Sequence, residues 1–208
     1  MHRLFLGLPI DTGVAESISA WASSELTGTR VVPSENLHVT LLFFGSVDEA
    51  TRDRLIGLTQ ETVWEPIAAR TGELAAFGKS TLALRLEVAE EQIERLEDRL
   101  ARASKIAPPG MPFGEFEDWM RTWSRPEDLL HQMALLVQEP DKEKKRRCQR
   151  QQRPLELHLT VARTKSRPVL ELSEKLPPVD LVLDRLVLFE SHLGPEGSRY
   201  EVLAEAGR

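Results

Sequence analysis

Cysteine, tyrosine and long apolar runs are scarce in this sequence. The 208-residue chain has one tyrosine and one cysteine, Cys148, which stands in a basic run and cannot form an internal disulfide. No stretch approaches the roughly 20 apolar residues that a membrane-spanning helix needs. These absences exclude a disulfide framework and leave no support for a zinc site or a membrane role. They favour a reducing, cytoplasmic setting.

Excess positive charge is also missing, because the formal net charge is -6. Proteins that hold long nucleic acids by bulk electrostatics carry many lysines and arginines to neutralise phosphates. Any contact with RNA is therefore expected to be local and directed at an end of the strand. The length suits one compact domain over residues 1–208. We expect a monomer.

Apolar periodicity predicts the secondary structure. Strands are expected at 3–8, 37–44, 67–77, 81–88, 156–162, 180–190 and around 200–204. Helices are expected from Asp11 or Thr12 to Glu25, from a capping box at Ser46 and Glu49 to about Glu61, and over 90–105, with a helical turn near 169–175. Strands and helices alternate without the glycine-rich turns of a nucleotide-binding parallel sheet. The predicted fold class is therefore α+β with antiparallel pairing.

Two segments depart from this pattern. Residues 106–153 open with IAPPGMPFG and end in DKEKKRRCQRQQR, and we interpret them as an insertion. The basic run over 142–153 is either a contact for an RNA backbone or a solvated loop. GKST at 78–81 ends like a phosphate-binding P-loop, but the glycine that should precede it is missing. A hairpin turn is the prediction there.

One five-residue pattern occurs twice: LHVTL at 37–41 recurs as LHLTV at 157–161. In a strand, alternate side chains share a face, so His38 and Thr40 project together, as do His158 and Thr160. The apolar residues of each copy project to the other side. Each copy therefore presents one imidazole and one hydroxyl on a surface that is backed by apolar packing.

These residue types suit phosphoryl chemistry. An imidazole titrates near neutral pH and can give or take a proton, and a hydroxyl can hydrogen-bond a phosphate oxygen. Two such pairs facing each other could grip one phosphate, with one histidine deprotonating a water and the other protonating the leaving alkoxide. No metal or other cofactor is needed. A lone histidine on a strand is usually a plain surface residue, and His2, His131 and His192 have no repeated context that argues otherwise.

The sequence resembles the two-histidine (2H) phosphoesterase superfamily, and within it the RNA 2',3'-cyclic phosphodiesterases once described as 2'-5' RNA ligases. Four segments carry the resemblance: RLFLGLPI at 3–10, NLHVTLLFFG at 36–45, LHLTVAR at 157–163 and LVLFESHLGPEGSRYEVL at 186–203. Two features depart from the family pattern. The histidines are 120 residues apart, which is longer than expected, and Leu157 stands where a proline often precedes the second histidine.

The resemblance implies a bilobal fold, with two pseudo-symmetric antiparallel sheets and outer helices around a central cleft. It implies that His38 is the proton donor and His158 the proton acceptor, and that Thr40 and Thr160 hold the substrate phosphate. Arg163 matches a basic position near that phosphate, although a solvated cation at a strand end is the plainer reading of this residue.

The reaction that the resemblance implies opens a terminal RNA 2',3'-cyclic phosphate, or a small cyclic nucleotide, to a 2'-phosphomonoester. Two alternatives stay open from the residues alone. One is ligation of tRNA halves through 2'-5' linkages, which runs the same phosphate chemistry in reverse. The other is a module that binds RNA ends or nucleotides without turnover.

Overall fold

The computed structural model describes residues 1–78, 80–106, 155–165, 176, 178–194 and 197–207 of the chain. The elements in order are β1 His2–Pro9, α1 Thr12–Glu25, β2 Arg30–Val31, η1 Ser34–Asn36, β3 His38–Val47, α2 Glu49–Glu61, β4 Ile67–Phe77, β5 Thr81–Val88, α3 Glu90–Ile106, β6 His158–Arg163, β7 Asp180–Leu183, β8 Leu186–Gly194 and β9 Gly197–Ala206. The expected insertion at 106–153, apart from the end of α3, and the helical turn near 169–175 lie outside the described residues.

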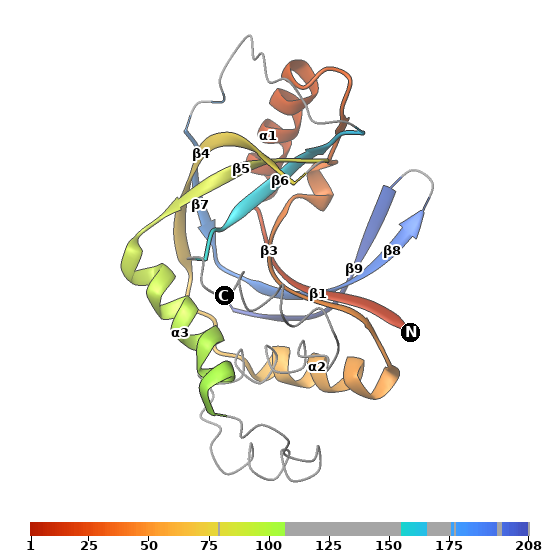
Figure 1. The fold of residues 1–208 in the computed structure, drawn as a ribbon, viewed down its shortest axis with the longest axis vertical. Coiled ribbons are helices and arrows are strands. Elements are labelled where there is room, and N and C mark those ends of the chain that lie inside the picture. The colour runs from red at the N-terminus through yellow and green to blue at the C-terminus, as the bar shows by residue number, and fades with distance from the viewer. Residues whose placement is uncertain (79, 107–154, 166–175, 177, 195–196, 208) are drawn as a thin grey trace.

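Strand pairing is antiparallel throughout the described residues, and the strands follow the order β7-β4-β5-β6-β3-β1-β8-β9, with β2 paired to β6. This confirms the predicted α+β class. The two halves of the sheet are joined between β3 and β6, where Val39 lies opposite Leu159. Figure 1 shows the halves on either side of this junction, with β4, β5 and β7 on one side and the β8–β9 hairpin on the other.

The two halves have matching connections. Strand β1 leads through α1 to β3, its antiparallel neighbour, and β5 leads through α3 to β6 in the same way. Strands β3 and β6, which each begin with a His-x-Thr motif, therefore occupy equivalent positions in the two halves. This repeat supports the expected bilobal, pseudo-symmetric architecture.

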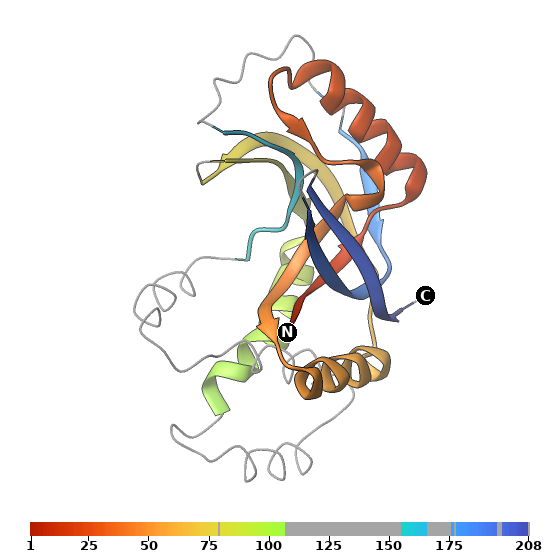
Figure 2. The ribbon, with the colours of Figure 1, turned by 90° about the vertical axis from the view of Figure 1, so that its right-hand side faces the viewer.

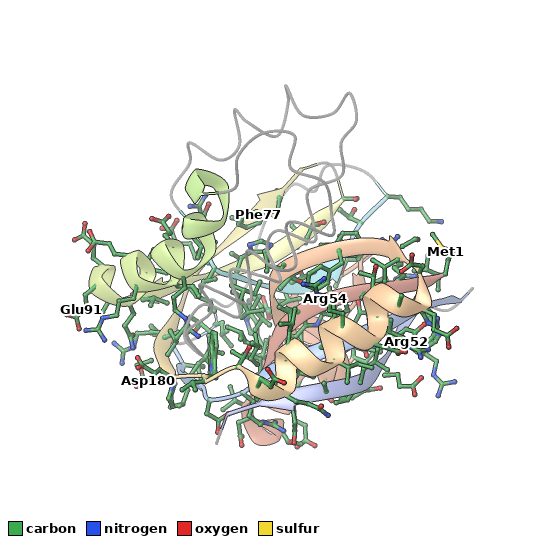
Figure 3. The ribbon with its side chains drawn as sticks, turned by 90° about the horizontal axis from the view of Figure 1, so that it is seen from below. Met1, Arg52, Arg54, Phe77, Glu91 and Asp180 are labelled. Carbon is green, nitrogen blue, oxygen red and sulfur yellow. The ribbon has the colours of Figure 1, made fainter. Side chains whose placement is uncertain are left out.

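The helices lie outside the sheet. Helix α1 packs against η1, β2 and β6, and α2 packs against β1, β8 and β9. Figure 2 shows α1 and α2 at opposite ends of the molecule, and Figure 3 shows α2, which carries Arg52 and Arg54, lying across the strands in the view from below. The core between these layers is built from leucine, isoleucine, valine and alanine, with Leu4, Leu6, Ile18, Val39, Leu55, Leu84, Leu159 and Leu183 almost inaccessible to solvent. Within the described residues, no helix combines the length and apolar character needed to cross a membrane.

Several predicted boundaries are confirmed, and two are wrong. The carboxylate of Asp11 caps α1 by accepting from the backbone N–H groups of Gly13 and Val14. The N-cap of α2, however, is Asp48 and not Ser46, because β3 continues through Ser46 in register with Arg3 of β1.

The second correction concerns the strand expected over 180–190, which is two strands. The chain leaves β7, which pairs with β4, and enters β8, which pairs with β1. It changes from one half of the sheet to the other at residues 184–185, so the ladder cannot be continuous. Gly78 and Ser80 lie in a turn, as predicted for this segment, and Gly78 takes a positive φ of 67° between the antiparallel strands β4 and β5.

Candidate active site

The two His-x-Thr motifs lie on adjoining strands at the centre of the sheet. Val39 and Leu159 are directly opposite each other and fully buried. Their neighbours at His38, Thr40, His158 and Thr160 are half-buried or exposed, so they project to the other side of the sheet. We call this side, which carries the two histidines and two threonines, the motif face.

The two histidines are held in the same way. Nδ1 of His38 lies 2.8 Å from the carbonyl oxygen of Asn36, and Nδ1 of His158 lies 3.2 Å from the carbonyl oxygen of Glu156. A carbonyl oxygen can only accept, so each Nδ1 carries a hydrogen and donates it to the residue two positions earlier. Each ring therefore has Nε2 left for chemistry, and in His38 this atom lies 3.1 Å from the hydroxyl of Thr40.

His38 sits among aromatic rings from three other strands. Its ring centroid lies 4.7 Å from that of Phe5 on β1, 5.8 Å from that of Phe189 on β8 and 5.1 Å from that of Tyr200 on β9. Gly7 leaves room for this arrangement, because a Cβ at this position would lie 3.1 to 3.3 Å from ring atoms of Phe189, Phe5 and His38. The neighbour of Thr40 across the β1–β3 ladder is this glycine.

The aromatic surroundings change the chemistry of His38. Burial, with a smaller contribution from repulsion by Arg163 and His158, lowers the pKa of His38 to about 4, although the hydrogen bond to the Asn36 carbonyl opposes the change. In the free protein at neutral pH the imidazole of His38 is therefore neutral. The two groups that repel a charge on His38, Arg163 and His158, both lie on β6.

His158 has a different environment, built from β4 and β5. The ring of Phe77 stacks on its ring, with centroids 4.4 Å apart and an angle of 15° between the planes. Arg85, directly opposite His158 in the β5–β6 ladder, pairs with the carboxylate of Glu156 and places its guanidinium 5.8 Å from the centre of the Phe77 ring. The Phe77 ring and the Glu156 carbonyl thus contact His158 directly, and Arg85 contacts both Phe77 and Glu156.

A β-bulge brings Arg163 to the motif face. The β5–β6 register shifts between Leu82 and Ala83, which leaves Val161 as an extra, fully buried residue on β6. Arg163 is five positions after His158, so in a regular strand the two side chains would lie on opposite faces and Arg163 would point to the core side. Its guanidinium instead donates to the hydroxyl of Thr81 at the exposed side of the strand.

The structure thus brings together all five residues that the sequence singled out. The aromatic group around His38 and the Phe77–Arg85 pair beside His158 were missed. Their only sequence signal was the presence of Phe5, Phe189 and the single tyrosine, Tyr200, inside the segments that carried the family resemblance. A one-dimensional pattern does not reveal which imidazole these rings contact.

Two motif strands that meet at the centre of an antiparallel sheet, each presenting an imidazole and a hydroxyl on one face, define the two-histidine class of phosphoesterase. The family model for the 2'-5' RNA ligase superfamily matches residues 10–120, which is more than half of the chain. The chain belongs to this superfamily.

Individual relatives agree with this assignment. The chain is 32% identical over 107 residues to the RNA 2',3'-cyclic phosphodiesterase of Bacillus subtilis, covering 50% of this chain and 58% of that protein. It is 31% identical over 77 residues to the enzyme of the same description from Archaeoglobus fulgidus, covering 36% of this chain and 44% of that protein. The matches span about half the length of these curated relatives.

Solved structures share the fold over nearly the whole chain. The crystal structure of TT0787 of Thermus thermophilus has a TM-score of 0.59 at 21% identity and covers 99% of this chain and 97% of its own. The crystal structure of E. coli LigT in apo form has a TM-score of 0.59 at 18% identity and covers 99% and 96%. At these identities the likeness establishes the fold, which is that of the 2H phosphoesterases.

Proposed function

We propose that this protein hydrolyses terminal RNA 2',3'-cyclic phosphates to 2'-phosphomonoesters by two-histidine acid/base catalysis. The proposal rests on one observation above all, the junction at Val39 and Leu159 that brings both motifs to a single face. Its reacting groups are Nε2 of His38 and Nε2 of His158, which the Nδ1 hydrogen bonds leave available.

In the proposed reaction, Nε2 of His158 takes a proton from a water molecule while the water oxygen attacks phosphorus. The bond between phosphorus and the 3' oxygen breaks, and Nε2–H of His38 donates a proton to that oxygen. The product has a 2'-phosphate and a 3'-hydroxyl. Each proton transfer is worth about 10²- to 10⁴-fold in rate. The step needs no electron transfer and no co-reactant other than water.

The threonines and Arg163 have supporting parts in this proposal. The hydroxyls of Thr40 and Thr160 would donate to the non-bridging phosphate oxygens, and the Arg163 guanidinium would offset their negative charge. The bulge at Val161 supports this part for Arg163, because the extra residue turns the side chain to the motif face.

Proton donation by His38 requires that it become protonated when substrate binds. Its pKa is about 4 in the free protein because of burial and the nearby positive charges. An anionic phosphate placed between His38, His158 and Arg163 counters that repulsion and raises the pKa of His38. His38 therefore becomes protonated, and able to act as the proton donor, when a phosphate binds.

The names of relatives support the substrate class. Three curated relatives are described as RNA 2',3'-cyclic phosphodiesterases. E. coli LigT, which shares the fold, has been crystallised with phosphate and with 3'-AMP. We extend to this chain the expectation of a ligand with a ribose phosphate, either an RNA 3' end or a small cyclic nucleotide.

The decisive experiment incubates the purified protein, with EDTA present, with an RNA oligomer ending in 2',3'-cyclic phosphate. Wild type is expected to yield a 2'-phosphate end, and His38→Ala and His158→Ala are each expected to lose at least 100-fold in rate. His192→Ala is the matched control, since this exposed histidine pairs with Glu201 away from the motifs. Absence of turnover by wild type on this RNA and on cyclic mononucleotides would refute the proposal and favour a binding module.

The superfamily name gives a second candidate, ligation through a 2'-5' linkage. Ligation would use the same displacement of the 3' oxygen from phosphorus, with the 5'-hydroxyl of an RNA as the nucleophile in place of water. Adding a large excess of 5'-hydroxyl RNA to the same assay separates the two. A joined product at the expense of the 2'-phosphate product would favour ligation.

We also propose that residues 106–153 are an insertion into a single 2H phosphoesterase domain. Within the described residues, α3 ends at Ile106, and the chain is next described at Leu155, just before β6. A deletion variant that joins these ends tests the purpose of the segment. Unchanged activity on long RNA would exclude an RNA-contacting arm.

A further inference from the structure

Two arginines face each other at the end of β6. Arg30 of β2 is directly opposite Arg163 in the antiparallel β2–β6 ladder. Directly opposed residues put their side chains on the same face, and like charges in such a pair destabilise the sheet. Within the described part of the chain, no carboxylate forms an ion pair with either guanidinium. Among the described residues no carboxylate therefore offsets the repulsion, and a bound anion would relieve it.

The guanidinium of Arg30 lies beside Gly197, at the start of β9. A Cβ built on Gly197 would be 3.6 Å from Nη1 of Arg30, which is an ordinary van der Waals distance. Strand β9 is held at this place, because Nδ2 of Asn36 donates to the carbonyl oxygen of Ser198 at 3.1 Å. The same Asn36 accepts from Nδ1 of His38 through its carbonyl oxygen. Arg30 thus lies at the rim of the motif face, near the residue that orients His38.

The two cations have different neighbours. Arg163 is one of the charges that lower the pKa of His38. Arg30 lies across the β2–β6 ladder from Arg163 and beside Gly197 of the β8–β9 hairpin. A ligand that satisfies both needs negative charge at two points.

We propose that Arg30, next to Arg163, binds a second phosphate, the phosphodiester on the 5' side of the terminal nucleotide. This inference rests on the proposed function, in which the cyclic phosphate occupies the motif face. Arginine presents a planar fork of donors that matches two phosphate oxygens. Because the protein as a whole is acidic, with a net charge of -6, such a local pair is the kind of cationic site able to select an RNA end. The ligand class is an oligoribonucleotide that carries at least one internucleotide phosphate.

The test compares three substrates in wild type, Arg30→Gln and Arg95→Gln. The substrates are a cyclic mononucleotide, a dinucleotide ending in cyclic phosphate, and the same dinucleotide with a neutral methylphosphonate linkage. Arg95→Gln removes the same charge from an exposed position on α3, away from β2 (Figure 1). We expect Arg30→Gln to lower kcat/KM about tenfold or more on the phosphodiester dinucleotide and less than twofold on the other two, with Arg95→Gln at wild-type levels.

Two further readouts make the result independent of folding and of turnover. The melting temperature of free Arg30→Gln should equal or exceed that of wild type, because the substitution removes a like-charge contact. Calorimetric binding of a 3'-phosphorylated dinucleotide should favour the phosphodiester over the methylphosphonate in wild type and lose this preference in Arg30→Gln. Absence of turnover by wild type would refute the proposed function. It would leave the binding test of the second phosphate site unaffected. Equal losses on all three substrates, or no loss on the phosphodiester dinucleotide, would overturn the second phosphate site.

Discussion

Val39 of β3 lies directly opposite Leu159 of β6, and this pair joins the two halves of the sheet. Each residue immediately follows a motif histidine in the sequence and is fully buried. The positions of His38 and His158 relative to each other are therefore set by the packing behind this pair. The spacing of the proposed acid and base is a property of the core at the junction.

Leu159→Ala should damage stability and activity together. Truncating a fully buried leucine usually lowers the free energy of unfolding by about 2 to 5 kcal/mol. At this position the cavity also lies behind His158 and opposite Val39, so kcat should fall. Leu183→Ala on β7 is the matched control, because Leu183 is equally buried but far from the motifs in the strand order. Urea unfolding and kcat, measured on both variants, should show similar destabilisation but a loss of kcat for Leu159→Ala only. Similar kcat values for both would contradict the role given to the junction.

The sequence predicted those features whose cause is local. The bounds of β4 and β5 and the capping of α1 by Asp11 follow from side-chain periodicity and short-range hydrogen bonds. The repeated His-x-Thr motif placed its four residues on one face for the same reason. The sequence did not reveal that the chain changes sheet halves after β7, or that β3 continues through Ser46, because these depend on which strand lies alongside.

The low pKa of His38 has the same non-local origin, since Phe5, Phe189 and Tyr200 come from strands distant in sequence. The lowered pKa of His38 predicts the pH profile of kcat/KM, because this profile reports the pKa values of groups in the free enzyme. The proposed reaction needs one proton in total on the two histidines, so a doubly protonated site is inactive. His38 takes up a proton in the free protein only near pH 4. We therefore expect kcat/KM to decline on the acid side only below a pH of about 4. Phe189→Ala admits water to His38, raises its pKa and should move this decline to higher pH.

The lowered pKa of His38 also makes the free energy of unfolding depend on pH. A histidine whose folded-state pKa is below the ordinary 6.5 binds a proton more readily in the unfolded chain, so the free energy of unfolding falls as pH drops from about 6.5 to 4. Circular dichroism at each pH should confirm that the protein stays folded during the kinetic measurements. NMR titration of the His38 ring should give the same value of about 4. A decline of kcat/KM on the acid side that begins near pH 6.5 in the folded wild type would contradict the burial argument.

Phe77 should affect His158 specifically. Phe77→Ala removes the ring that stacks on His158 at 4.4 Å and leaves the hydrogen bond to the Glu156 carbonyl in place. We expect kcat to fall about tenfold, with little change in KM, and Phe77→Trp to restore part of the loss because it keeps a stacking surface. Phe43→Ala is the control, since Phe43 is an exposed phenylalanine whose ring contacts Arg3. Equal effects of Phe77→Ala and Phe43→Ala on kcat would refute the positioning role.

The roles of the two histidines can be separated through the leaving group. In a cyclic phosphate whose 3' bridging oxygen is replaced by sulfur, the leaving thiolate is a far weaker base than an alkoxide and departs without a proton donor. If His38 is the donor, His38→Ala should lose about 10²- to 10⁴-fold on the oxygen substrate and much less on the sulfur substrate. His158→Ala should lose similar factors on both, because the attacking water still needs a base. Rescue of His158→Ala by sulfur would reverse the two roles, and rescue of neither variant would show that proton donation to the 3' oxygen does not limit the rate.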